Sequence, residues 1–305
     1  MIRRLKYHEI DFEKYTTCLE NSEQRKYSAV KDFLDITSGK QWELLVYKDY
    51  EAVMPVPFVT KFGLKIVINP MLCQQLGIFS VKDSVEINTF FLTFLKRNYL
   101  IGIYPFNDVN RFSSDLEKKK NYIINPDFYE NVYSKYSPKR KRKLRSDQEI
   151  LNDSEVKIIS FEDAQEFIQS HLLGANKKGD VIKFIKIFRK FSHFGLVFFH
   201  AYFYKNKITN VIAVYSDQKT NALLGTFNDK NYVKISGASI LIDQVIKKDI
   251  REKIFDFEGS ELPNVEEFFR GFRPELKPFP IIKSSKKDLL LQLLNPKYLL
   301  RFLHT

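Results

Sequence analysis

Cysteine is scarce in this sequence, and the few cysteines present are poorly spaced for a cross-linked or metal-bound fold. Only Cys18 and Cys73 occur in 305 residues, no Cys-x-x-Cys pair is present, and the five histidines form no pair at metal-ligand spacing. Disulfide frameworks and zinc sites both depend on such spacing. Neither is expected here, no metal is predicted, and we interpret both thiols as structural.

Long apolar runs are also missing. No stretch approaches the roughly 20 apolar residues that span a bilayer. Residues 1–9 carry Arg3, Arg4 and Lys6, but no apolar run of signal-peptide length follows them. We therefore expect a cytoplasmic protein.

Familiar hydrolase and nucleotidase motifs are absent as well. The sequence has no Gly-x-Ser-x-Gly elbow and no Walker loop, so neither class is supported. His200 lies among Phe198, Phe199, Tyr202 and Phe203. We interpret it as a core or cleft-lining residue rather than a catalytic base.

Positive charge, in contrast, is abundant. The formal net charge is +12, and such an excess attracts phosphate-bearing and other anionic molecules, including nucleic acid, nucleotide-linked substrates and anionic lipid. The same charge can arise from compositional bias without any ligand, so both interpretations stay open. A length of 305 residues predicts two domains of about 150 residues each.

The first half of the chain predicts an α/β unit. The hydrophobic pattern favours two short helices, an antiparallel meander of three strands, a longer helix and a buried strand. In chain order these elements are residues 11–19, 28–36, 42–47, 52–59, 64–68, 84–98 and 100–104.

The second half repeats this order, which predicts two copies of one α/β unit. The expected elements are helices 161–170 and 181–192, strands 196–204, 208–215 and 222–227, helix 237–248, strand 253–257, helix 265–269 and strand 279–283. A charged helical connector covers residues 128–151, with Pro138 at the first position of a helix. We place the domains at residues 1–125 and 126–285.

The last residues, 286–305, predict a helix with an apolar face that is broken near Pro296. It is expected to pack on domain one. The alternative is a peripheral membrane contact, because lysine and arginine side chains flank the apolar groups.

Four segments carry a resemblance to a known family: residues 133–145, 231–239, 255–260 (Phe-Asp-Phe-Glu-Gly-Ser) and 268–272 (Phe-Phe-Arg-Gly-Phe). The last two are the most specific. A strand that ends in an Asp-Phe-x-Gly turn, followed by a helix and an aromatic-Gly-Phe step, resembles the Fem-like peptidyltransferase branch of the GNAT superfamily. The resemblance covers most of residues 40–283, without the long helical hairpin of some members.

This resemblance implies a fold of two tandem GNAT-like domains, each a mixed, mainly antiparallel sheet flanked by helices. It also implies transfer of an acyl or aminoacyl group to an amine. Some Fem-like proteins use aminoacyl-tRNA to build peptidoglycan cross-bridges, whereas other GNAT proteins use acyl-coenzyme A or carrier-protein thioesters. No tightly bound cofactor is expected, and the sequence does not choose among these donors.

A candidate donor-binding segment lies between a predicted strand and a predicted helix. Small residues at a helix start leave the first backbone amides open to an anion, and the helix dipole favours negative charge there. A pyrophosphate or a tRNA phosphate could dock on this segment, although a helix start of this kind also occurs purely for capping. Its residues are Lys234, Ser236, Gly237, Ala238 and Ser239.

Asp256 and Glu258 are the candidate catalytic residues. With Ser260 they alternate along a strand end, so they would share one face if the extended conformation persists. A carboxylate can accept or orient the proton of an attacking amine. The alternative is that Asp256 caps a loop and that Glu258 is solvated.

The connector contains six basic residues in the seven positions 139–145. The candidate acceptor- or anion-binding residues are Lys139, Arg140, Arg142 and Arg145. They could hold the phosphates of a nucleotide-linked acceptor or a tRNA, with Tyr133 and Tyr136 able to stack on bases or sugars. The alternatives are a solvated helix, or a non-catalytic module that binds nucleic acid or another anionic polymer.

Overall fold

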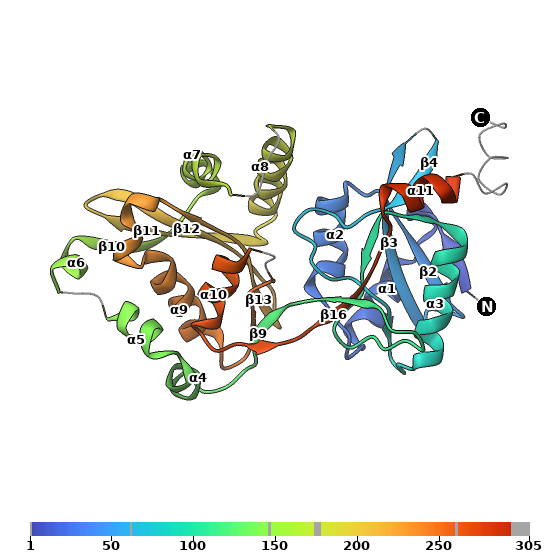
Figure 1. Cartoon of the computed structure of the whole chain (residues 1–305), viewed down its shortest axis with the longest axis horizontal. Coiled ribbons are helices and arrows are strands. Elements are labelled where there is room, and N and C mark those ends of the chain that lie inside the picture. Colours follow the sequence, from blue (N-terminus) through green and yellow to red (C-terminus); the bar gives the residue numbers. More distant parts are fainter. Residues whose placement is uncertain (1, 62, 146–147, 174–177, 260–261, 294–305) are drawn as a thin grey trace. The chain divides into compact units, whose positions relative to one another are not determined.

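The computed structural model describes residues 2–61, 63–145, 148–173, 178–259 and 262–293 (Figure 1). These residues form two compact units. The first unit is built from described residues of 1–119 and 278–305, and the second from described residues of 120–277. The chain therefore leaves the first unit once and returns to it at its C-terminal end.

The first unit contains a sheet in the order β1-β2-β3-β4-β6, with β5 (Phe79–Ser80) pairing with β3 off this path. Neighbouring strands are antiparallel except β4 and β6, which are parallel. The strands of the main path are β1 (Ile2–Leu5), β2 (Trp42–Tyr47), β3 (Ala52–Lys61), β4 (Leu64–Val67) and β6 (Leu100–Ile101).

Two helices of the first unit begin at residues whose side chains cap them. Asp11 accepts hydrogen bonds from the amides of Glu13 and Lys14, and Ser84 accepts one from the amide of Ile87. The helices are α1 (Phe12–Glu20), α2 (Lys31–Ser38), α3 (Val85–Asn98) and α11 (Lys286–Leu293), with short 3-10 turns at Tyr7–Glu9 and Tyr27–Ala29.

A second, three-stranded sheet completes the first unit in the order β7 (Ile103–Pro105), β16 (Phe279–Lys283), β8 (Glu117–Lys119). The sequence pattern assigns residues 279–283 to the second domain, whereas the strand pairs with β7 and β8 of the first. It also predicts one strand over residues 100–104, but the chain is interrupted at Gly102 into β6 and β7.

The helix α11 also packs on the first unit. Its Leu289 and Leu293 contact a small cluster formed by Leu64 and Leu100. Two further leucines, Leu290 and Leu291, are more than half exposed. Pro296, where the sequence predicts a helix break, lies outside the described residues.

The second unit contains a sheet in the order β10-β11-β12-β13-β14-β9-β15. Only the pair β13 and β14 is parallel. The strands are β9 (Tyr122–Ile124), β10 (Ser154–Ile159), β11 (Val197–Tyr204), β12 (Lys207–Ser216), β13 (Thr220–Asn228), β14 (Ile254–Asp256) and β15 (Glu275–Leu276).

Helices cover both faces of this sheet. In Figure 1, α7 (Phe161–His171) and α8 (Lys178–His193) lie above it, and α9 (Gly237–Asp249) and α10 (Pro263–Arg270) lie below. The remaining helices are α4 (Tyr129–Lys135), α5 (Pro138–Leu144) and α6 (Gln148–Asn152), with a 3-10 segment at Lys230–Ile235. Pro138 opens α5, as its sequence position predicts, and the Ser137 side chain caps it.

The two units share one order of elements, which confirms the predicted repeat. Apart from the two-residue strand β5 between β4 and α3, the first runs β1, α1, α2, β2, β3, β4, α3, β6, and the second runs β10, α7, α8, β11, β12, β13, α9, β14. In each, four antiparallel strands are followed by a helix and a strand parallel to the fourth.

In the part of the chain that the structure describes, no helix combines the length and the apolar character needed to cross a membrane.

Candidate functional site

The pairing between β13 and β14 is short, and most of β13 pairs with no strand on that side among the described residues. Only Thr220, Asn221 and Ala222 of β13 pair with β14, opposite Ile254, Phe255 and Asp256. Beyond these residues β13 continues to Asn228, whereas β14 ends at Asp256. The end of β13 leads to the start of α9, and the end of β14 leads to Glu258, so the predicted donor-binding and catalytic segments follow neighbouring strands.

The start of α9 packs closely against the sheet. Ser236 has a left-handed backbone, with φ of 63°, and precedes Gly237. A β-carbon at Gly237 would fall on the Asn210 side chain and 3.0 Å from Cδ1 of Tyr202. Only a glycine fits there, so α9 begins where its first amides are held against β11 and β12.

Exposure divides the five predicted donor-binding residues into two groups. Gly237, Ala238 and Ser239 are buried, whereas Lys234 is exposed and Ser236 is half-buried. The first amides of a helix have no acceptor within it, and the dipole favours an anion at that end. The side chains of this segment that solvent reaches are therefore those of Lys234 and Ser236.

Asp256 is buried and organises the turn that follows β14. Its carboxylate accepts a hydrogen bond of 2.8 Å from the Glu258 amide and one of 3.3 Å from the Asn121 side chain. Glu258 has φ of 61° and is half-buried. The extended conformation that would place Asp256 and Glu258 on one face therefore ends at Asp256, and Ser260 lies outside the described residues.

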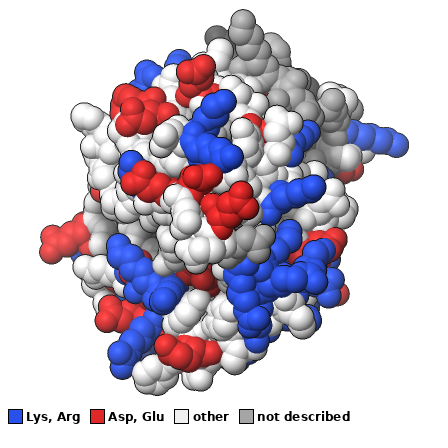
Figure 2. Space-filling view, turned by 90° about the vertical axis from the view of Figure 1, so that its left-hand side faces the viewer, with Lys and Arg blue, Asp and Glu red and all other residues white. Residues whose placement is uncertain are grey.

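Three of the predicted anion-binding residues lie at the surface, two on α5 and one directly after it. Lys139, Arg142 and Arg145 are exposed, and Lys139 forms an ion pair of 3.4 Å with Glu267. In Figure 2, lysine and arginine side chains cover much of the lower half of one face, with aspartate and glutamate side chains among them. Exposed cations of this kind attract anions.

Arg140 departs from the prediction because it points inward. It is 4% exposed, and its guanidinium donates hydrogen bonds to Ser239 Oγ and to the Phe268 carbonyl oxygen. The guanidinium carbon also lies 4.3 Å and 4.1 Å from the ring centroids of Phe268 and Phe272. A residue buried in this way is unable to join a surface contact with an acceptor.

The local charges shift several pKa values. Burial lowers the pKa of Arg140 to about 10, which leaves it cationic at neutral pH. Burial, followed by repulsion from Arg140 and Lys139, lowers the pKa of Lys143. Burial also lowers the pKa of His200 to about 4, so that this imidazole is neutral at pH 7. The side chain is half-buried, which fits the interpretation as a core or cleft-lining residue.

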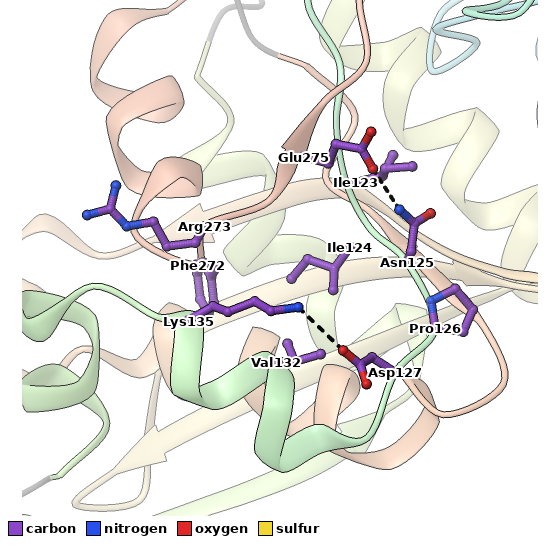
Figure 3. Close-up of a pocket in the computed structure, with 10 residues that line it drawn as sticks. All are labelled: Ile123, Ile124, Asn125, Pro126, Asp127, Val132, Lys135, Phe272, Arg273 and Glu275. Carbon is purple, nitrogen blue, oxygen red and sulfur yellow. Dashed lines mark hydrogen bonds and ion pairs between the residues drawn. The ribbon is translucent and has the colours of Figure 1, made fainter.

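A cavity of about 180 Å³ in the second unit was not predicted (Figure 3). In the figure, the Lys135 side chain extends from α4 toward Asp127, and the Arg273 guanidinium points away from the other lining groups. Lys135 and Asp127 form an ion pair of 3.4 Å. The lining residues are Ile123, Ile124, Asn125, Pro126, Asp127, Val132, Lys135, Phe272, Arg273 and Glu275.

The sequence signal for this cavity is weak. Its walls come from the three-residue strand β9, from α4 and from the segment before β15, which no periodicity connects. Among the described residues, no group of three or more His, Cys, Asp or Glu side chains is arranged to hold a metal ion.

The sequence matches no protein-family model and no curated protein. The structure, however, is similar to solved structures along nearly its whole length. FemX matches with a TM-score of 0.63 at 10% identity, covering 96% of this chain and 99% of FemX. A tandem GNAT protein from the clavulanic acid biosynthesis pathway matches with a TM-score of 0.51 at 6% identity, covering 92% and 97%.

A third similar structure is the C-terminal DUF2156 domain of a candidate lysylphosphatidylglycerol synthetase from Agrobacterium fabrum. It matches with a TM-score of 0.52 at 11% identity, covering 95% of this chain and 96% of that domain. At such identities the likeness concerns the fold. The chain therefore has the tandem GNAT fold of FemX and its structural relatives, as the segments at 255–260 and 268–272 predict.

Proposed function

We propose that this protein transfers an acyl or aminoacyl group to an amine and so forms an amide. The observation that carries the proposal is the arrangement in the second unit, where α9 starts beyond the end of β13 and the Asp256–Glu258 turn follows the neighbouring strand β14. This arrangement occurs within a fold similar to that of FemX and of a tandem GNAT protein.

In the proposed reaction the donor's phosphate lies at the start of α9. Lys234 and Ser236 contact it, and the amides of Gly237 and Ala238 face its negative charge. Ser239 and the close approach of Gly237 to Asn210 shape this turn. The donor is an aminoacyl-tRNA, an acyl-coenzyme A or an acyl carrier thioester.

The acceptor nitrogen attacks the acyl carbonyl carbon. A carbon–nitrogen bond forms, the bond from the carbonyl carbon to the donor oxygen or sulfur breaks, and the amine loses a proton. Glu258 orients the amine or accepts this proton, and the leaving group is protonated in turn. Asp256 holds the turn that presents Glu258, through its hydrogen bond from the Glu258 amide.

The exposed residues of α5 attract an anionic acceptor, such as a nucleotide-linked precursor. Lys139, Arg142 and Arg145 contribute this charge, and Arg140 does not, because it is buried. A non-catalytic module that binds nucleic acid or another anionic polymer is the second candidate. The same three exposed side chains favour it.

A binding screen of the whole protein tests these proposals. Thermal shift and calorimetry should detect one donor among coenzyme A, acyl-coenzyme A species, charged tRNA and nucleotide-linked cell-wall precursors. Stabilisation that is saturable and persists at moderate salt supports a transferase. If no donor binds, and RNA binds with an affinity that falls steeply as the salt concentration rises, the transferase is contradicted and the binding module is supported.

A further inference from the structure

The inward face of α5 contacts two segments that are distant in the sequence. Arg140 lies on this face, and α5 packs against α9. The Ser137 amide donates a hydrogen bond of 3.0 Å to the Gly271 carbonyl oxygen, next to the place where Arg140 enters. One short helix therefore touches both the start of α9 and the turn after α10.

The Arg140 guanidinium makes the central contacts of this junction. One terminal nitrogen donates to Ser239 Oγ in the first turn of α9, and the other donates to the Phe268 carbonyl oxygen over 2.7 Å. The Phe268 and Phe272 rings lie 4.3 Å and 4.1 Å from the guanidinium carbon. These contacts fix the guanidinium in position and in orientation.

Gly271 leaves the room that this arrangement needs. A β-carbon there would lie 3.0 Å from one terminal nitrogen of Arg140 and 3.1 Å from Nε. The backbone of Gly271 has a φ of −60°, which any residue adopts. The glycine therefore gives room for the close approach of Arg140 and is not needed for the backbone conformation.

Burial of this cation is costly. Nε of Arg140 has no hydrogen-bond partner among the described residues. Burial lowers the pKa of Arg140 and outweighs the electrostatic interactions with Tyr136 and Asp243, which raise it. An apolar side chain of similar length would fill the space between two phenylalanine rings without the desolvation of a charge. The charge and the planar fork of donors therefore point to a role beyond packing.

We propose that Arg140 is a positioning residue that fixes the first turn of α9 against the turn at residues 268–272. As a consequence, the amides of Gly237 and Ala238 are held in place to bind the donor's phosphate. This consequence rests on the proposed function.

Three substitutions separate positioning from packing. Ser239→Ala removes the hydroxyl that accepts from Arg140 and leaves the arginine in place. Arg140→Met keeps an unbranched apolar stem but removes the charge and every donor. Arg140→Lys keeps the charge but loses the planar fork. Lys141→Met is the matched control on α5, because Lys141 donates to the Ser134 carbonyl oxygen and takes no part in the junction.

The experiment uses the whole protein, with inorganic pyrophosphate as the probe. Hydrogen exchange followed by mass spectrometry reports on the amides of residues 236–240, and calorimetry gives the pyrophosphate Kd. In the wild type, pyrophosphate should slow exchange in this segment. In Arg140→Met and Ser239→Ala, exchange there should be faster and the Kd about tenfold higher, the effect of one charged hydrogen bond.

Arg140→Lys should recover part of the affinity, and Lys141→Met should resemble the wild type in exchange at residues 236–240. If Arg140→Met proves too unstable to study, Ser239→Ala alone tests the proposal. It removes a single oxygen and therefore disturbs the fold least. Unchanged exchange and unchanged Kd in Ser239→Ala overturn the proposal. So does a wild type whose residues 236–240 are not protected by pyrophosphate.

Neither measurement requires turnover. If pyrophosphate protection depends on Arg140 but no acyl group is transferred from any donor, the positioning role stands and the proposed activity is wrong. If the protein is an active transferase but Ser239→Ala leaves its pyrophosphate Kd unchanged, the proposed activity stands and the positioning role is wrong.

Discussion

The guanidinium of Arg140 stacks on the ring of Phe272, with 4.1 Å between the guanidinium carbon and the ring centroid. Arg140 belongs to the basic connector, and Phe272 belongs to the aromatic-Gly-Phe step that resembles the Fem-like proteins. Two segments that the sequence suggests separately thus form one junction. The glycine between Phe268 and Phe272 gives the arginine its space.

Replacement of Gly271 tests this packing directly. Gly271→Ala should lower the free energy of unfolding by about 1–3 kcal/mol, because the new methyl group is forced against Arg140 and the Phe268 carbonyl oxygen. Urea denaturation followed by circular dichroism measures the change. Gly179→Ala is the control, since a β-carbon at Gly179 meets nothing within 4 Å. Equal stability of the two variants would argue against a tight junction.

Gly237→Ala should be more harmful than Gly271→Ala. Its β-carbon falls on the Asn210 side chain, which is 5% exposed and donates a hydrogen bond of 2.8 Å to Asn228. The start of α9 must then move away from β12, so we expect a lower midpoint of thermal unfolding. The double variant Gly237→Ala with Asn210→Ala should regain part of the loss. No regain would show that the clash lies elsewhere.

The order of elements was largely predictable, because the apolar residues of most helices and strands recur with the spacing of a helix or of a strand. The strands that were not predicted are short or lie at an edge. β9 has three residues and depends on pairing with β14, and β10 alternates only weakly between half-buried and exposed positions. The assignment of β16 to the first unit depends on contacts with β7 and β8, which no local pattern encodes.

The sequence predicted which segments form the candidate site, but it did not predict the direction in which each side chain points. The run at 139–145 shows charge in six of seven positions and does not show by itself which one turns inward. A signal was present in the spacing of Arg140 and Leu144, which lie four residues apart and share one face of α5. Leu144 packs on the core, so Arg140 on the same face also points inward.

The first unit contains a buried carboxylate that makes stability depend on pH. Glu43 is 1% exposed and pairs with Arg4 and Lys65. Burial raises its pKa, but hydrogen bonds from Arg4 and Lys65 outweigh burial and lower the pKa below the ordinary 4.5. The folded state therefore gains stability from the ionised form above about pH 4.5 and loses it as the pH falls further.

Glu43→Gln should destabilise the protein by about 2–4 kcal/mol at pH 7, because two partly buried cations lose their partner. The difference from the wild type should shrink as the pH falls below 4.5, which urea titrations at several pH values measure. Glu51→Gln is the control, since Glu51 and Lys48 are both mostly exposed. A difference that is independent of pH would contradict the assigned pKa.

Substitutions of Asp256 and Glu258 should affect different properties, the first mainly stability and the second mainly activity. Asp256→Ala removes the acceptor for the Glu258 amide and the Asn121 side chain, and should cost about 1–3 kcal/mol of stability. Glu258→Gln keeps the shape of the side chain and should leave the unfolding midpoint near that of the wild type. Thermal unfolding of both variants gives the comparison. Equal losses would assign Glu258 a structural role.

The most direct test of the proposed function is amide formation itself. The donor that binds in the screen should be labelled in its acyl group, and transfer to amine acceptors should be followed by mass spectrometry of the product. The proposal predicts a saturable rate that falls about a hundredfold or more in Glu258→Gln, the range for loss of a general base. Lys234→Ala should raise the donor KM. If both variants transfer the acyl group as the wild type does, the assigned site is contradicted.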